Sequence, residues 1–180
     1  MTRSSRFERP DPPYAADEVT MLRAFLDYYR VTIKRQAEGL TSEQLATPLP
    51  PATMTLGGML KHLAGVEQWW LPMVLEGREN EPDWVDEAAM GADDDWEWHS
   101  AKDDDLETLF AIFDEAVTEA DRVIDAALEG EGLDTLAQRP RRDGSVGTLR
   151  WILVHLIEEY ARHAGHADLI RESIDGATDL

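Results

Sequence analysis

Residues 148–176 read TLRWILVHLIEEYARHAGHADLIRESIDG, and this segment says most about the fold. Its apolar residues recur at spacings of three and four, the period of an amphipathic helix. They are Leu149, Ile152, Leu153, Leu156, Ile157, Tyr160, Leu169 and Ile170. We expect the helix to start near Ser145 or Thr148, whose hydroxyl groups can cap a helix N-terminus, and to end at Gly176.

Three earlier segments have the same period and are bounded by residues that start or stop helices. They run from Asp17 to about Glu38, from Thr53 or Thr55 to the helix-breaking Pro72, and from about Asp103 to Gly130. No alternating run of strand length competes with them, and no internal repeat appears. The chain is therefore predicted to be all-α, an antiparallel four-helix bundle with long connecting loops.

The chain has 180 residues, the size of one domain. We expect residues 1–16 to be an extended or disordered N-terminal arm, residues 17–176 to form the bundle, and residues 177–180 to be a C-terminal tail. Two loops stand out. Residues 76–101 are acidic and rich in tryptophan, and we expect them to hold short helices or cover a site. Residues 131–147 form a polar crossover before the last helix.

Charge and composition exclude several classes of partner. Seventeen basic and 37 acidic side chains give a net charge of −20, which disfavours nucleic acid and an anionic membrane surface. No apolar run is long enough to span a bilayer, and the N-terminus does not have the pattern of a secretory signal, so a cytoplasmic location is expected. Because the chain has no cysteine, a metal site would use imidazole and carboxylate ligands.

The last helix carries a cluster of such ligands. His155, Glu159, His163 and His166 share one face, and residues four apart can hold one ion, so the usable pairs are His155/Glu159 and Glu159/His163. His62 is the one other histidine within an apolar helical stripe, which makes it the candidate third ligand. A histidine in such a stripe is more often an ordinary core residue, so the pattern alone leaves both interpretations open.

Two stretches resemble a known family. LKHLAGVEQWW (residues 60–70) and WILVHLIEEYARHAGHAD (residues 151–168) are similar to the DinB-like superfamily, and closer to its actinobacterial branch of mycothiol-dependent enzymes. The resemblance covers about residues 17–176. It implies His62, Glu159 and His163 as metal ligands, because only His163-Ala164-Gly165 fits the His-x-Gly pattern of the last ligand. Many relatives have histidine in place of Glu159, whereas the mycothiol-dependent maleylpyruvate isomerases have glutamate there.

The resemblance also implies a function. It points to an enzyme in which a divalent metal, Zn²⁺ first and Ni²⁺ or Fe²⁺ as alternatives, activates a low-molecular-weight thiol such as mycothiol. The thiol then attacks an electrophilic substrate, in S-transfer or in thiol-assisted isomerisation. Two alternatives stay open: a hydrolase that uses a metal-bound hydroxide, and a non-catalytic metal- or ligand-binding bundle. A homodimer is a further implication of the resemblance.

Other residues are secondary candidates, each with a structural alternative. Glu67 could orient a metal-bound ligand or make a buried hydrogen bond. His155 could line the active-site pocket or bond within the bundle. Arg139, Arg141 and Arg142 could bind a carboxylate of the thiol or substrate, or could simply balance nearby acids.

The tryptophans of the acidic loop have two explanations as well. Trp96 and Trp98, next to His99, could line or cover a pocket, but packing of the loop onto the bundle would explain them equally well.

Overall fold

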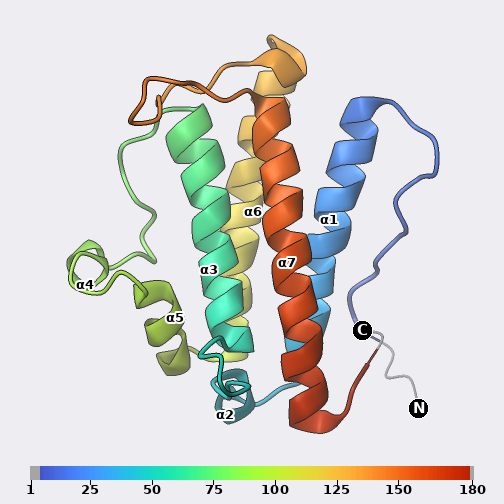
Figure 1. Cartoon of the computed structure of the whole chain (residues 1–180), viewed down its shortest axis with the longest axis vertical. Helices are drawn as coiled ribbons and strands as arrows, with labels where there is room; N and C mark the ends of the chain where they lie inside the picture. The colour runs from blue at the N-terminus through green and yellow to red at the C-terminus, as the bar shows by residue number, and fades with distance from the viewer. Residues whose placement is uncertain (1–4, 179–180) are drawn as a thin grey trace.

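Four long helices lie side by side in the structure, a computed structural model that describes residues 5–178 (Figure 1). They are α1 (Glu18–Ala37), α3 (Leu56–Gln68), α6 (Leu106–Glu129) and α7 (Leu149–Asp175). Within the described residues the only β pairing is an isolated bridge between Leu136 and Thr148. The predicted all-α class is confirmed. No helix in this part of the chain combines the length and hydropathy that crossing a membrane requires.

Local capping explains where these helices begin. The side chains of Asp17, Thr55, Asp105 and Thr148 each accept a hydrogen bond from the backbone N–H three residues further along, which satisfies a donor that the helix itself leaves free. At its other end, α7 stops at Gly176, which has a φ of 74°. This left-handed conformation favours glycine. These helix boundaries therefore lie close to the ones expected from the sequence.

Pro72 has a different effect from the one expected. The α-helical part of the second segment ends at Gln68, and the chain continues as a π-helix, η1 (Trp69–Leu75), with Pro72 inside it. Proline has no N–H and cannot donate to the carbonyl four residues earlier. A π-helical turn pairs residues five apart. It lets the segment remain helical for about another turn and a half after Gln68.

Polar contacts between helices fix their directions. Arg150 at the start of α7 pairs with Glu18 at the start of α1. Arg171 near the end of α7 donates to the backbone carbonyl of Gln36 near the end of α1. These two helices therefore run the same way, and Figure 1 shows that α3 and α6 both run the opposite way. The predicted antiparallel arrangement holds between the two pairs but not within them, because residues 76–105 return along the outside and start α6 at the same end as α3.

The helices enclose one hydrophobic core. Its central side chains are 0–1% exposed and come from all four long helices; they include Leu26, Leu60, Leu63, Leu109, Phe113, Leu153 and Leu156. Burial of this apolar surface is the main favourable contribution to folding. The core holds α3 against α7, and these are the helices that carry the candidate ligands.

The connecting segments hold short helices. These are α2 (Ser42–Leu45), α4 (Glu87–Met90), α5 (Trp96–Ser100) and the 3₁₀ turns η2 (Ala101–Asp103) and η3 (Gly132–Asp134). Helix α5 packs on α3 where Gly58 leaves room, since a Cβ at this position would lie 2.7 Å from the ring of Trp98. The expectation that the tryptophan-rich loop contains short helices is confirmed.

The predicted arm has no regular secondary structure from residue 5 up to α1. It contacts α6 through Phe7, whose ring meets that of Phe110 edge to face at 5.5 Å. Residues 1–4 of the arm and 179–180 of the tail lie outside the described residues.

Candidate metal centre

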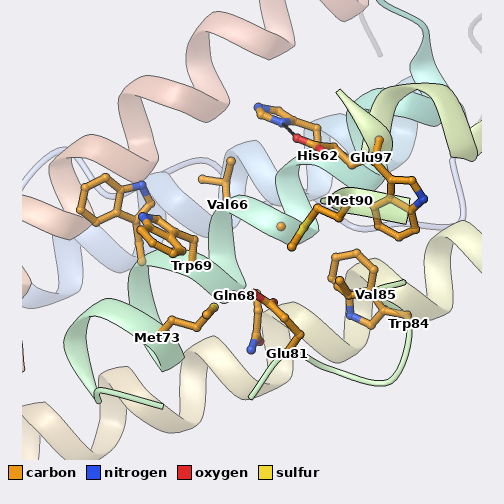
Figure 2. Close-up of a pocket in the computed structure, with 13 residues that line it drawn as sticks. His62, Val66, Gln68, Trp69, Met73, Glu81, Trp84, Val85, Met90 and Glu97 are labelled. Carbon is orange, nitrogen blue, oxygen red and sulfur yellow. Dashed lines mark hydrogen bonds and ion pairs between the residues drawn. The ribbon is translucent and has the colours of Figure 1, made fainter. Parts of the chain in front are cut away.

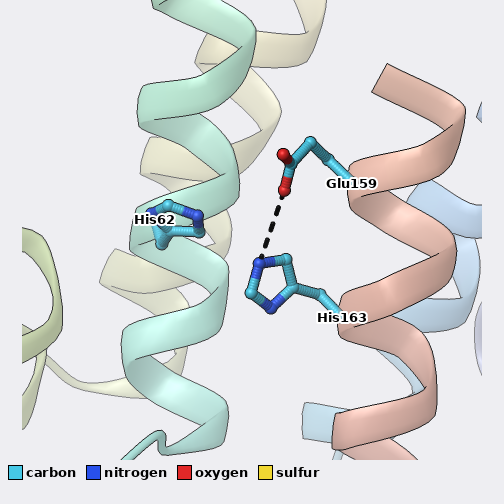
Figure 3. A group of neighbouring side chains, drawn as sticks. All are labelled: His62, Glu159 and His163. Atoms are coloured by element: carbon cyan, nitrogen blue, oxygen red, sulfur yellow. Dashed lines mark ion pairs between the residues drawn. The ribbon is translucent and has the colours of Figure 1, made fainter. Parts of the chain in front are cut away.

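The three residues implied as ligands lie together between two helices (Figure 3). His62 comes from α3, and Glu159 and His163 come from successive turns of α7. One ligand atom of each residue lies within 4.8 Å of those of the other two. The Nε2 atom of His163 is 3.7 Å from Oε2 of Glu159, and the ring centroids of the two histidines are 5.0 Å apart.

This group fits a divalent cation. Ligand atoms about 2.0–2.2 Å from a tetrahedral Zn²⁺ lie roughly 3.4 Å from one another, so only small side-chain movements would be needed. His163 is 7% exposed, and its buried Nδ1 atom has no hydrogen-bond partner among the described residues. A buried polar group without a protein partner is costly unless something else satisfies the residue. Two imidazoles and one carboxylate are a common ligand set for catalytic zinc and for several transition metals.

The environment keeps His163 neutral. Burial first, and then the nearby His62 and His166, lower the pKa of His163 to about 4. A metal ion binds only the neutral imidazole, so the residue is already in the correct form at neutral pH.

A pH prediction follows for the metal-free protein. The pKa of His163 is about 4 in the folded chain and near 6.5 in an unfolded one. Between these values the unfolded state binds a proton that the folded state does not, so the contribution of His163 lowers the free energy of unfolding as the pH falls from about 6.5 towards about 4. Thermal midpoints are measured without metal from about pH 8 to about pH 4, and they should decrease between about pH 6.5 and about pH 4.

The same titration with added Zn²⁺ tests the ligands. Protons compete with the ion for its ligands, at His163 only as the pH approaches the pKa of about 4, so the gain in thermal midpoint that Zn²⁺ produces should shrink towards the acid end of the titration. A gain that stayed constant over the whole range would show that these histidines do not hold the ion.

Glu97 is a site residue that we did not predict. Its Oε1 atom lies 3.1 Å from Nδ1 of His62, and this hydrogen bond lowers the pKa of Glu97. The ring of Trp98 stacks on His62 with centroids 4.8 Å apart. A carboxylate on one ring nitrogen fixes the orientation of the imidazole and leaves Nε2 for a metal. The acidic, tryptophan-rich composition of the loop was the only signal, and it does not single out Glu97.

His155 lies on the other side of Glu159. Its Nε2 atom is 3.8 Å from Oε1 of Glu159, so the two oxygens of this carboxylate face different histidines, His155 and His163. The His155 ring stacks on Trp151 at 5.0 Å. His155, Glu158 and Glu159 also form a group of possible ligands, but Glu158 is exposed. The arrangement is compatible with a pocket role for His155.

Glu67 is placed away from the candidate ligands. It is 0% exposed and follows His62 by five residues, about 140° around the helix. Arg30 donates to both of its oxygens, at 2.7 and 2.9 Å, and the hydroxyl of Tyr160 donates at 2.8 Å. Because these donors occupy both oxygens, the geometry favours a structural role over one at a metal ion.

The three arginines separate into two groups. Arg139 lies over the ring of Trp69 at 5.3 Å, and Arg141 lies over that of Trp151 at 4.6 Å. Both line a cavity of about 170 Å³. Arg142 is exposed and is not part of that lining. The structure therefore brings two of the three predicted binding residues to one cavity.

A larger cavity of about 350 Å³ adjoins His62 (Figure 2). It lies within the size range of small-molecule sites. Trp96 and Glu97 of α5 form part of its wall, and Trp70 lines this cavity as well as the smaller one. The sequence left a pocket role and loop packing equally open for two tryptophans; Trp96 lines the cavity, and Trp98 stacks on His62.

Comparison with known proteins gave a match to a family model but none to a curated protein. No match was found among curated proteins. A family model described as mycothiol-S-transferase matches residues 21–176, which include all four long helices almost completely and every candidate ligand. On the evidence of this match, the chain belongs to the mycothiol-S-transferase family.

Proposed function

We propose that the protein is a metal-dependent enzyme that transfers a low-molecular-weight thiol, mycothiol or a close analogue, to an electrophilic substrate. The observation that carries this proposal is the cluster of His62, Glu159 and His163 beside a ligand-sized cavity, in a chain of the mycothiol-S-transferase family. We propose Zn²⁺ as the metal and a DinB-like bundle as the fold type.

The sulfur nucleophile must come from a bound thiol, because the chain has no cysteine. A divalent cation held by these ligands would deprotonate a coordinating thiol and so supply the reactive sulfur at neutral pH. The neutral imidazoles of His62 and His163 and the carboxylate of Glu159 would hold that cation. Glu97 would keep the His62 ring in the required orientation through its hydrogen bond to Nδ1.

In this proposal each of the two cavities binds a different reactant. The larger one, beside His62, has the apolar and aromatic wall suited to an electrophile and would exclude water from it. The smaller one presents Arg139 and Arg141, which can bind the polar part of a thiol cofactor. Trp70 stands between them and lines both.

A panel of thiols tests the proposal. The metal-loaded protein is mixed with a generic electrophile, with or without mycothiol, glutathione or cysteine, and the same reactions are repeated after the metal has been chelated. Turnover that needs both thiol and metal, with sulfur in the product, supports S-transfer. Metal-dependent turnover without thiol would indicate the alternative hydrolase, and no turnover in any mixture would indicate a binding protein.

The arginines supply a second prediction. Changing both Arg139 and Arg141 to Gln should raise the KM for an anionic thiol roughly tenfold and leave kcat nearly unchanged, because charge-assisted hydrogen bonds to the bound thiol are lost. Arg142→Gln is the matched control, since this residue lies outside the cavity, and its KM should not change. Equal KM values for the double variant and the unchanged protein would disprove the binding role.

A further inference from the structure

The wall of the larger cavity is strongly aromatic. Four indole rings and several aliphatic or thioether side chains line it, from Trp69, Trp70, Trp84, Trp96, Val66, Met73, Val85 and Met90. Flat aromatic groups pack well against such rings, and cations are attracted to their faces. Lys61, whose ammonium nitrogen lies 4.6 Å from the centre of the Trp96 ring, gives an example of that attraction within the protein.

The charged groups of the wall are carboxylates. Glu81 and Glu97 line the cavity, and no lysine or arginine does. Glu97 is already bonded to His62, but Glu81 makes no hydrogen bond or ion pair with any described residue, although it is partly buried. Burial raises the pKa of Glu81, with Glu87 adding to the effect and Arg139 opposing it. A cation brought next to this carboxylate would offset the cost of its desolvation.

Gln68 adds a polar group that has no partner. Its side chain is 4% exposed and lines the cavity, and its buried Nε2 atom makes no hydrogen bond within the described part of the chain. Figure 2 shows Gln68 and Glu81 together at one end of the cavity and His62 with Glu97 at the other. The carboxylate of Glu81 can accept hydrogen bonds from an ammonium group.

We infer that this cavity binds an aromatic electrophile that carries a protonated amine. The ring lies against the tryptophans, the ammonium group binds Glu81, and the reactive end faces His62. The inference rests on the proposed function in calling the ligand an electrophile and in placing the reaction at His62. It makes negatively charged electrophiles poor ligands for this cavity.

Binding of three matched probes tests this without any turnover. Naphthylmethylamine, naphthylmethanol and naphthoate share a ring system and differ in charge. Their dissociation constants are measured by calorimetry on the full chain loaded with Zn²⁺ and again after chelation. The amine should bind about tenfold more tightly than the alcohol, and naphthoate should bind more weakly than both. Equal or tighter binding of naphthoate would overturn the inference.

Two variants locate the effect. Glu81→Gln should remove most of the tenfold preference for the amine and leave the affinity for the alcohol unchanged. Glu79→Gln is the matched control, because Glu79 is exposed in the same loop and does not line the cavity, and it should bind as the unchanged protein does. Retention of the full preference in Glu81→Gln would overturn the role of this residue. Thermal midpoints of both variants show whether they remain folded.

The outcomes separate this inference from the proposed function. If the amine preference is found but thiol-dependent turnover is absent, the proposed function is wrong and the cavity chemistry stands. If thiol transfer occurs but naphthoate binds best, the proposed function stands and the substrate class is wrong.

Discussion

Alanine at His62, Glu159 or His163 is expected to abolish stoichiometric metal binding. Each change removes one of the three proposed protein ligands, and the remaining pair cannot enclose an ion. Because the ligands of a preformed site act together, we expect at least a 100-fold loss of affinity, the upper end of the range seen even for indirect partners of a metal. Elemental analysis of protein purified without chelators, followed by competition with a coloured indicator, measures both occupancy and affinity.

His166→Ala is the matched control for this series. His166 lies on the same helix, one turn beyond His163, with ring centroids 5.6 Å apart, and it is not part of the group whose ligand atoms converge. This variant should keep most of its metal. Full metal content in His62→Ala would exclude the assignment, and loss of metal in His166→Ala would extend the ligand set to that residue.

Glu67→Ala is expected to cause a large loss of stability and to leave metal content intact. The substitution leaves the Arg30 guanidinium, with a side chain 5% exposed, without its main partner and removes the acceptor for Tyr160. Breaking a buried pair in this way costs about 3–5 kcal/mol. In a protein of this size that corresponds to a fall in thermal midpoint of roughly 10 °C or more.

A surface ion pair supplies the comparison. Glu119 pairs with Arg78 and Arg122 on the exposed side of α6, and Glu119→Ala should cost less than about 1 kcal/mol. Calorimetric unfolding of both variants at neutral pH measures the difference. If Glu67→Ala unfolded at the same temperature as the unchanged protein but lost its metal or its activity, Glu67 would belong to the metal centre after all.

The helices could be predicted from the sequence because their signals are local. Asp17 and Thr148 satisfy backbone donors three residues away, and Gly176 adopts its conformation whatever the rest of the fold does. The directions of the helices and the π-helical turn at Pro72 could not be predicted in this way. Both depend on how the long segment 76–105 returns along the bundle and on how the second helix packs.

The candidate site shows the same division. Glu159 and His163 are one turn apart on a single helix, so spacing alone brings them together, and the family resemblance added His62. Glu97 meets His62 across 35 residues of chain, through a loop whose path no periodic pattern specifies. The distinction between Arg141 at the cavity and Arg142 outside it is also a property of the folded loop and is invisible in the sequence RPRR.

Helix α5 contributes to both the cavity and the candidate metal centre. Trp96 and Glu97 form part of the cavity wall, and Glu97 also holds the His62 ring. Occupancy of the cavity and occupancy of the metal site therefore both depend on this helix. Thermodynamic reciprocity then applies, so the factor by which a cavity ligand changes metal affinity equals the factor by which the metal changes affinity for that ligand. A molecule that holds α5 against α3 would slow the release of the ion. A molecule that displaces α5 would weaken metal binding without contacting the metal.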